Sequence, residues 1–271
     1  MSDFQYPLGF IGAGNMAEAI ARGAIESGAL RPEQMAAADP SPERRALFEG
    51  LGLSTFDDAA ALVPRCAQVM LAVKPQVSAS LAEAMQEVDR DRQVVISIMA
   101  GVTIEQLETA MGGPARVIRV MPNTPLMVGQ GMSAVAVGEH AEDGKDENLC
   151  VRVLQSCGKV VKVVEEDLDA VTAVSGSGPA YVFLFIEAMT RAAQELGLSD
   201  LSETLVQQTF RGAVQMLFES APDPEELRRQ VTSPGGTTQA AIEHLQKHGF
   251  EELIRDAVVA ARDRSIELGR G

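Results

Sequence analysis

The sequence predicts an α/β fold in which a doubly wound sheet is followed by an all-α domain, and three observations predict it. Short apolar runs alternate with helical patterns over residues 1–163, and this alternation is typical of βαβ units with parallel strands. Long helical periods dominate over residues 164–271. The length of 271 residues suggests one large domain or two of ordinary size, and the change of pattern places the boundary between two domains after residue 163.

The predicted strands are short runs rich in small and branched apolar residues. They are Leu8–Ile11, Met35–Ala38, Val69–Val73, Val94–Ile98, Val117–Val120 and Ser133–Val137. Helical patterns lie between most of them, for example Met16–Ser27 and Pro42–Leu51. Thr103 is followed three residues later by Gln106, the pattern of a capping box, so a helix is expected to begin just after the strand that ends near Ile98.

The segment Tyr181–Leu196 in the helical half is apolar on every face. Val182, Ile186 and Met189 follow helical spacing, and Phe183 to Phe185 fill the remaining faces. Such a helix is buried in a large core or in a subunit interface. Because a helical region of about 105 residues has limited burial of its own, we expect a homodimer or a higher homo-oligomer.

Charge and cysteine content exclude several classes of protein. The net charge of −15 argues against a general nucleic-acid binder and against docking on anionic lipid. The three cysteines form no CxxC pair and there are only three histidines, so no metal site is expected.

The N-terminus carries no targeting pattern and no apolar run approaches the ~20 residues of a membrane span. We therefore expect a cytoplasmic protein with no membrane or nucleic-acid partner.

A glycine-rich fingerprint follows the first predicted strand. In Leu8–Ala17, Gly12 allows a tight turn, Gly14 admits a pyrophosphate, and Ala17 permits close packing of the helix on the strand. The helix N-terminus beyond supplies free N–H groups for phosphates. Because a strand, a helix and a second strand surround it, this pattern indicates a Rossmann-type domain that binds a nicotinamide dinucleotide for a redox reaction.

Asp39, at the end of the second predicted strand, bears on the choice of cofactor. A carboxylate there can bind both ribose hydroxyls of NAD and would repel a 2′-phosphate. The alternative is that Asp39 only begins the turn at Pro40. Arg44 and Arg45 follow closely and are suited to binding a phosphate. The sequence leaves the choice between NADPH and NADH open.

Other unusual residues follow predicted strands, where ligands bind in such folds. They are Lys74-Pro75, Ala100-Gly101 and Met121-Pro122-Asn123-Thr124-Pro125. Prolines on both sides restrain Asn123, which can present its amide to a carboxamide or carboxylate. The alternatives are a solvated cation for Lys74 and a turn residue for Asn123.

Two glycine-rich loops lead into helices of the C-terminal half. Ser175–Tyr181 precedes the most apolar helix, and its glycines allow it to line a pocket. Thr232–Thr238 precedes a second helical pattern, Gln239–Lys247. Its N–H groups and threonine hydroxyls suit a small anionic or polar ligand, although a well-capped helix that binds nothing is the alternative.

Together these motifs resemble those of the pyrroline-5-carboxylate reductases, in order and approximate spacing from residue 9 to 238. The matching segments are Gly9–Ala17, Ala72–Pro75, Ala100–Thr103, Met121–Pro125, Ser175–Tyr181 and Ser233–Thr238. The resemblance implies an N-terminal cofactor domain, a helical dimerisation domain, and NAD(P)H-dependent reduction of a cyclic imino acid, 1-pyrroline-5-carboxylate, to L-proline.

The resemblance also implies the functional residues. The implied cofactor contacts are Ile11, Gly12, Ala13, Gly14, Asn15, Met16, Val73, Lys74 and Ala100. The chemistry and positions of Asp39 and Asn123, described above, add these two residues as candidate cofactor contacts. Substrate contacts fall on Thr237 and Thr238, with Ser233 and the Gly235-Gly236 backbone beside them. We hypothesise that the helix start at Gly236–Thr238 grips the carboxylate and that the Thr238 hydroxyl contacts the ring nitrogen, which arrives protonated.

This sequence departs from the family pattern at three places. The family often has Ser, Thr or Asn where Asp39 stands, and often an Asn in the region of Asp57 and Asp58. It often reads His-Pro-Gly where this chain has Asp223-Pro224-Glu225. Two alternative functions remain. The first is a 3-hydroxyacid dehydrogenase; those enzymes use a catalytic Lys in the helical half, where this chain has only Lys247. The second is a dinucleotide sensor without catalytic activity.

Overall fold

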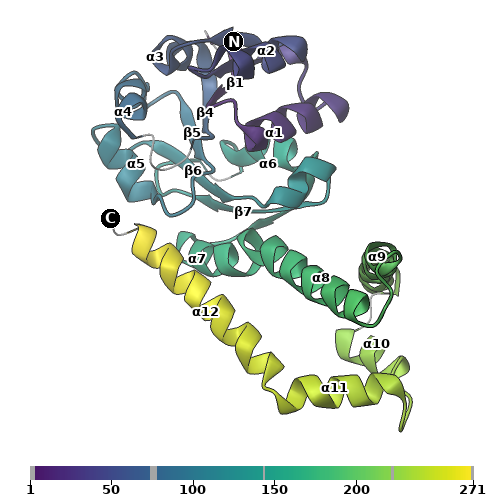
Figure 1. Ribbon diagram of the computed structural model, residues 1–271. Coiled ribbons are helices and arrows are strands. Elements are labelled where there is room, and N and C mark those ends of the chain that lie inside the picture. The colour runs from purple at the N-terminus through teal and green to yellow at the C-terminus, as the bar shows by residue number, and fades with distance from the viewer. Residues whose placement is uncertain (1–3, 74–77, 143, 221–222, 270–271) are drawn as a thin grey trace. The chain divides into compact units, whose positions relative to one another are not determined.

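The computed structural model describes residues 4–73, 78–142, 144–220 and 223–269 (Figure 1). The chain forms two compact units. The first consists of Met1–Ser177 with Ala261–Gly271, and the second of Gly178–Ala260. The last turns of the final helix therefore belong to the first unit, where Ser265 Oγ donates to Asp169 Oδ1 at 2.6 Å.

The first unit is built on an eight-stranded sheet with the order β3-β2-β1-β4-β5-β6-β7-β8. The strands are β1 (Tyr6–Ile11), β2 (Met35–Ala38), β3 (Ser54–Phe56), β4 (Cys66–Leu71), β5 (Val94–Ser97), β6 (Arg116–Met121), β7 (Gly131–Val137) and β8 (Gly158–Lys162). Their pairings are parallel except for the antiparallel pair β6–β7. The doubly wound, mainly parallel sheet predicted from the sequence is confirmed.

Helices cover both faces of this sheet (Figure 1). They are α1 (Asn15–Glu26), α2 (Pro42–Gly50), α3 (Ala59–Leu62), α4 (Ser78–Gln86), α5 (Ile104–Ala110), α6 (Glu147–Gln155) and α7 (Leu168–Val171). Residues of α1, α2 and α6 form one core with Leu8 and Phe10 of β1. Residues of α3, α4 and α5 form a second core with Ile11 and Val69. The central strands are buried on both faces, which is why they are continuous apolar runs in the sequence.

The two strands that the sequence did not predict, β3 and β8, lie at the edges of the sheet. Their residues are only half-buried or exposed, so neither carries an apolar run. The predicted capping box is confirmed: the Gln106 N–H donates to Thr103 Oγ1 at 3.2 Å, and the Thr103 N–H donates to Gln106 Oε1 at 2.9 Å.

The helices of the second half are α8 (Gly178–Glu195), α9 (Ser202–Ser220), α10 (Pro224–Gln230), α11 (Thr237–Lys247) and α12 (Phe250–Gly269). Phe185 of α8 makes ring contacts with Phe210 of α9 and Phe250 of α12 at centroid distances of 5.6 and 6.0 Å. The predicted helical character of this half is therefore confirmed.

The apolar helix α8 is uncovered in the single chain. None of its residues is buried, and Phe183 and Leu184 are 59% and 65% exposed. The prediction that this helix is buried in a large core of its own chain is therefore wrong, and burial in a subunit interface remains.

The helical stretch Glu165–Glu195 meets the length and hydropathy of a membrane span, contrary to the expectation that no segment would. The reason is that an 18-residue window within this stretch is apolar and holds at most two charged residues, a property that an interface helix shares.

Asp146 is a buried carboxylate, 3% exposed, that links β6 to the start of α6. It accepts hydrogen bonds from the Arg116 guanidinium, with Nε at 2.7 Å, and from the Glu142 N–H at 2.8 Å. Burial acts to raise the pKa of Asp146, but these donors outweigh it and hold the pKa below the usual 3.8. Its stabilising contribution is therefore complete above that value and is lost as pH falls through the lowered pKa.

Asp146→Asn is accordingly expected to lower the free energy of unfolding at neutral pH by about 1.5–3 kcal/mol, the value of hydrogen bonds to a charged group. The variant should also lose less stability than the original protein on acidification. Denaturant unfolding at a series of pH values measures both effects. Glu139→Gln, which removes an exposed carboxylate, is the control. Equal acid sensitivity of Asp146→Asn and the original protein would contradict the assignment.

Candidate active site

A cavity of about 340 Å³ lies at the carboxyl ends of β1, β2, β3 and β4. The chain runs from β1 toward β3 on one side of the sheet and from β4 toward β8 on the other, so β1 and β4 flank the point where the strand order reverses. Ligands of open α/β sheets bind at this point. The cavity is lined by Ile11, Gly12, Gly14, Ala38, Asp39, Pro40, Asp57, Asp58, Ala59, Ala72, Val73 and Leu81.

Gly12 and Gly14 shape the floor of this cavity in different ways. Gly12 has φ +93°, and a Cβ there would lie 2.7 Å from Val73 Cγ1 and 2.8 Å from the Ala72 carbonyl oxygen. Gly14 has an ordinary extended backbone, and a Cβ there would approach only the Ala72 oxygen, at 4.0 Å. Gly12 is thus required by the turn itself, whereas Gly14 leaves open space beside the helix start.

The N-terminus of α1 offers free donors to this space. Its N-cap is Gly14, whose lack of a side chain leaves the first-turn N–H groups uncapped. An N-terminus of this kind binds anions, phosphates above all. The open side of Gly14 and the uncapped helix together fit the pyrophosphate of a dinucleotide.

Asp39 is fixed beside the glycine-rich loop by two backbone donors. Its Oδ2 accepts from the Ala13 N–H at 2.8 Å, and its Oδ1 accepts from the Ser41 N–H at 2.9 Å. The second bond forms the turn that the sequence offered as the alternative interpretation. Asp39 also lines the 340 Å³ cavity, so it has a place at the candidate ligand site as well.

A second cavity, of about 580 Å³, adjoins the same loop. It is lined by Gly14, Asn15, Met16, Arg44, Ala72, Val73, Ile98, Met121, Pro122, Asn123, Thr124 and Gly176. Gly14, Ala72 and Val73 line both cavities, which places the two side by side along the carboxyl edge of the sheet. A dinucleotide needs two such compartments joined at its pyrophosphate.

Asn123 lines the second cavity, but its amide is bonded within the protein. Nδ2 donates to the Ser175 carbonyl oxygen and Oγ at 3.2 and 3.3 Å, and Oδ1 accepts from the Met132 N–H at 2.9 Å. The side chain thereby connects the loop after β6 to the π-helical turn Thr172–Gly176. Its direct contact with a cofactor stays a prediction, and its observed role is to order this wall of the cavity.

The structure brings most of the predicted cofactor residues together. Those that line one or both cavities are Ile11, Gly12, Gly14, Asn15, Met16, Asp39, Val73 and Asn123. Ala13 is buried, and its N–H is taken by Asp39. Ala100 is exposed and lines neither cavity, and Lys74 lies outside the described residues.

Several lining residues were not foreseen from the sequence: Pro40, Leu81 and Ile98 contribute apolar surface. Arg44, which the sequence offered as a residue suited to binding a phosphate, lines the second cavity and not the first. Ile98 directly follows β5, so its position at a strand end was the signal available. Leu81 belongs to a helix face that local spacing does not connect to the glycine-rich loop.

The predicted substrate residues lie in the second unit at the start of α11. Gly235 has φ +70°, and its N–H donates to Gln239 Oε1 at 2.6 Å, while the Gly236 N–H donates to the Ser233 carbonyl oxygen at 3.0 Å. Gly236 is the N-cap of α11 and supplies no side chain. The N–H groups of Thr237 and Thr238 are therefore available to an anion, as expected for a carboxylate site.

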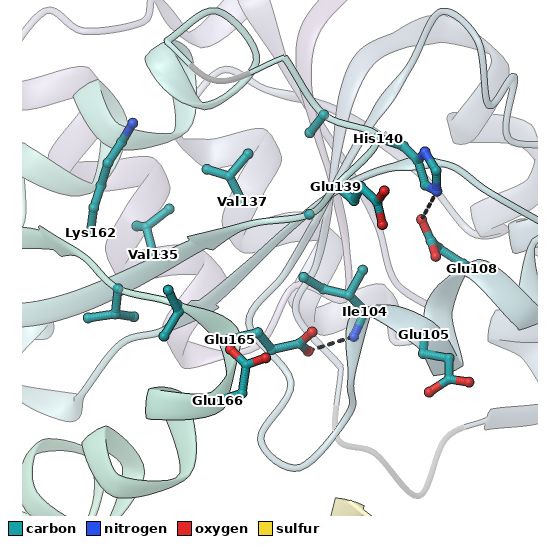
Figure 2. A pocket seen from close by; sticks show the side chains of 14 residues that line it. Ile104, Glu105, Glu108, Val135, Val137, Glu139, His140, Lys162, Glu165 and Glu166 are labelled. Atoms are coloured by element: carbon teal, nitrogen blue, oxygen red, sulfur yellow. Dashed lines mark hydrogen bonds and ion pairs between the residues drawn. The ribbon is translucent and has the colours of Figure 1, made fainter.

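A larger cavity, of about 740 Å³, lies elsewhere in the first unit and differs in character (Figure 2). Glu105, Glu108, Glu139, Glu165 and Glu166 line it together with His140 and Lys162. Glu165 accepts from the Ile104 N–H at 2.8 Å, and His140 Nε2 lies 3.8 Å from Glu108 Oε1. None of its lining residues belongs to the glycine-rich loop or to the N-terminus of α1, which would hold a pyrophosphate.

Comparison with known proteins agrees with this geometry. The family model "Pyrroline-5-carboxylate reductase dimerisation" matches residues 165–268, and "NADP oxidoreductase coenzyme F420-dependent" matches residues 7–101. A pyrroline-5-carboxylate reductase of Pisum sativum is 41% identical over 264 residues, covering 97% of this chain and 96% of the relative.

Solved structures of the same class are also similar. A pyrroline-5-carboxylate reductase from Coxiella burnetii has a TM-score of 0.89 and 36% identity, covering 97% of this chain and 98% of that one. A pyrroline carboxylate reductase from Plasmodium falciparum, with NADP bound, has a TM-score of 0.86 and 32% identity, covering 98% and 99%. From this near-complete coverage and the geometry of the glycine-rich loop, we conclude that the chain belongs to the pyrroline-5-carboxylate reductase family.

Proposed function

We propose that this protein reduces 1-pyrroline-5-carboxylate to L-proline with NAD(P)H, the final step of proline biosynthesis. The observation that carries the proposal is the presence in one chain of two uncapped glycine-led helix starts, at Gly14 and at Gly236. The first fits a pyrophosphate and the second fits a carboxylate. The near full-length similarity to reductases of this class supports the same function.

The substrate is a five-membered ring with a C=N bond and one carboxylate. We assign the carboxylate to the N–H groups of Thr237 and Thr238, at the helix start that Gly236 caps, with Ser233 beside them. The Thr238 hydroxyl is assigned to the ring nitrogen, which arrives protonated. The reduced nicotinamide, when bound, supplies the hydride that the C=N carbon accepts, and the C=N electron pair then stays on nitrogen as the amine. Positioning by these residues provides most of the rate.

We further propose that residues 1–163 form the cofactor domain and that residues 164–271 form the domain for dimerisation and substrate binding, in a homodimer or a higher homo-oligomer. The start of the dimerisation match at residue 165 supports this boundary. The exposed apolar surface of α8 supports the association, because a surface of this kind is normally covered by a partner. We place the protein in the cytoplasm, where the free cysteines Cys66, Cys150 and Cys157 remain reduced.

Leu184→Glu on α8 is expected to dissociate the oligomer, because it places a charge on a surface that association would remove from water. Size-exclusion chromatography with light scattering measures the mass. Gln194→Glu, which introduces the same charge at an exposed polar position of the same helix, is the control and should leave the mass unchanged. An unchanged oligomer in Leu184→Glu would contradict the role of this face.

The function is tested by following the loss of reduced-nicotinamide absorbance with pyrroline-5-carboxylate as substrate. We expect turnover that depends on both the imine and the dinucleotide, with L-proline as the product by mass spectrometry. A sample that binds the dinucleotide but oxidises it with no cyclic imine would overturn the assignment.

A further inference from the structure

The 340 Å³ cavity beside the glycine-rich loop carries an unusual concentration of negative charge. Asp39 follows β2, and Asp57 and Asp58 follow β3, so three carboxylates line one compartment. Of the described residues that line it, none is a lysine or an arginine. We propose that this compartment excludes a 2′-phosphate and that the protein therefore uses NADH in preference to NADPH. The proposal rests on the dinucleotide site assigned above and names which dinucleotide that site takes.

The position of the Asp39 carboxylate is fixed. Both of its oxygens accept from backbone N–H groups, those of Ala13 and Ser41, at 2.8 and 2.9 Å. Because Ala13 belongs to the loop between β1 and α1, the carboxylate is held in register with the pyrophosphate-binding turn. An acid at the end of β2 in such a fold faces the adenosine ribose, where it accepts from ribose hydroxyls and repels a phosphate. A rotation of Asp39 away from that phosphate would cost both hydrogen bonds.

The nearby arginines do not offset this charge. Arg44 donates through Nε to the Ala13 carbonyl oxygen and through Nη2 to Glu18 Oε2 at 2.9 Å, and it lines the other cavity. Arg45 donates through Nη1 to the carbonyl oxygens of Asp39 and Pro40 at 2.7 and 2.9 Å. Both guanidinium groups are thus held by protein acceptors, and neither arginine is among the residues that line the 340 Å³ cavity. A 2′-phosphate in that cavity would face the three carboxylates without an arginine from this pair beside it.

The relative from Plasmodium falciparum was solved with NADP bound, so this type of fold can accommodate the phosphate. At 32% identity that protein has its own side chains around the ribose, and the preference proposed here depends on the residues of this chain. A phosphate ester carries about −1.5 to −2 charges at neutral pH. Its repulsion by partly exposed carboxylates is long-ranged and is screened by salt.

The decisive measurement is the dissociation constant of NADH and of NADPH for the purified, unmodified protein, determined by calorimetry without an imine. NADH is expected to bind about tenfold more tightly or better, the ratio that one uncompensated charge contact of about 1.4 kcal/mol produces. The preference should decrease as the salt concentration rises. Equal affinities, or tighter binding of NADPH, would overturn the proposal.

Variants locate the cause. Asp39→Asn should shift the affinity ratio toward NADPH by about tenfold. Asp57→Asn removes a charge from the same cavity and should shift the affinity ratio in the same direction by about threefold. The Asp57 side chain makes no hydrogen bond to another described residue, so this variant remains informative even if Asp39→Asn lowers the stability of the protein. Glu43→Gln removes an equal charge from α2 outside the cavity and should leave the ratio unchanged. An unchanged ratio in both aspartate variants would overturn the proposal.

These outcomes separate the preference from the function itself. Turnover of pyrroline-5-carboxylate with NADPH favoured overturns only the preference. Tight, selective NADH binding without turnover on any cyclic imine supports the preference and overturns the reductase assignment. Failure to bind either dinucleotide overturns both.

Discussion

Thr238→Val is expected to lower kcat for imine reduction by about 10²-fold, while the dissociation constant of the dinucleotide stays the same. The size of the effect is that of removing one positioned hydrogen-bonding group, here the hydroxyl oxygen that accepts from the protonated ring nitrogen, from a reacting centre. Thr238 is half-buried at the second position of α11, and its hydroxyl makes no hydrogen bond to another described residue. The hydroxyl is therefore available to a ligand, and its loss should leave the melting temperature unchanged.

The control for this prediction is Thr238→Ser, which keeps the hydroxyl and removes only a methyl group. It should retain most of the turnover, whereas Thr238→Val keeps the shape and loses the hydroxyl. Steady-state kinetics with saturating dinucleotide, together with calorimetric binding of the dinucleotide alone, measure the two effects. Full turnover in Thr238→Val would remove Thr238 from the proposed contact with the ring nitrogen.

Gly14→Ala is expected to weaken dinucleotide binding by about 10- to 100-fold without destabilising the fold. The backbone of Gly14 is extended and the new Cβ would have no neighbour closer than 4.0 Å, so the unliganded protein accommodates it. The same Cβ would enter the space where the pyrophosphate approaches the α1 N-terminus. Loss of one charge-assisted hydrogen bond there costs about 1.5–3 kcal/mol, which corresponds to this range of affinity.

Gly12→Ala is the matched comparison, because its effect should fall on the fold. Alanine at φ +93° is strained, and its Cβ would lie 2.7 Å from Val73 Cγ1. We expect a loss of about 1–3 kcal/mol in the free energy of unfolding. Thermal unfolding and dinucleotide calorimetry on both variants separate the two roles. Unchanged binding in Gly14→Ala would show that the pyrophosphate does not approach this glycine.

Local patterns were sufficient to predict most of the first unit from the sequence. β2 begins and ends at the predicted residues, Met35 and Ala38, because a strand buried on both faces is an uninterrupted apolar run. The helix start at Thr103 was also predicted correctly, because the capping box depends on residues only three positions apart. The glycine-rich turn at Gly12 was predicted for the same reason.

The edge strands and the antiparallel pairing of β6 with β7 required the tertiary structure. β8, Gly158–Lys162, has a neighbour on one side only and lies largely exposed, so burial did not select an apolar pattern for it. β7 runs antiparallel to β6 because the short connection through Thr124–Val128 returns the chain directly to the sheet. Hydrophobic spacing predicts a strand at β7 but not its direction.

In the candidate site, too, local sequence determined some features and the tertiary structure decided others. The sequence by itself determined the glycine-rich loops, the acid at Asp39 and the glycine-led helix start at Gly236, because each depends on a few consecutive residues. Only the tertiary structure decided that Asp39 bonds to Ala13, that Arg44 pairs with Glu18, and that Asn123 bonds to Ser175. These partners lie 26 to 52 residues apart in the chain. Such contacts form only after the sheet has assembled, because they depend on which strand ends become neighbours, and this order is a property of the whole packed core.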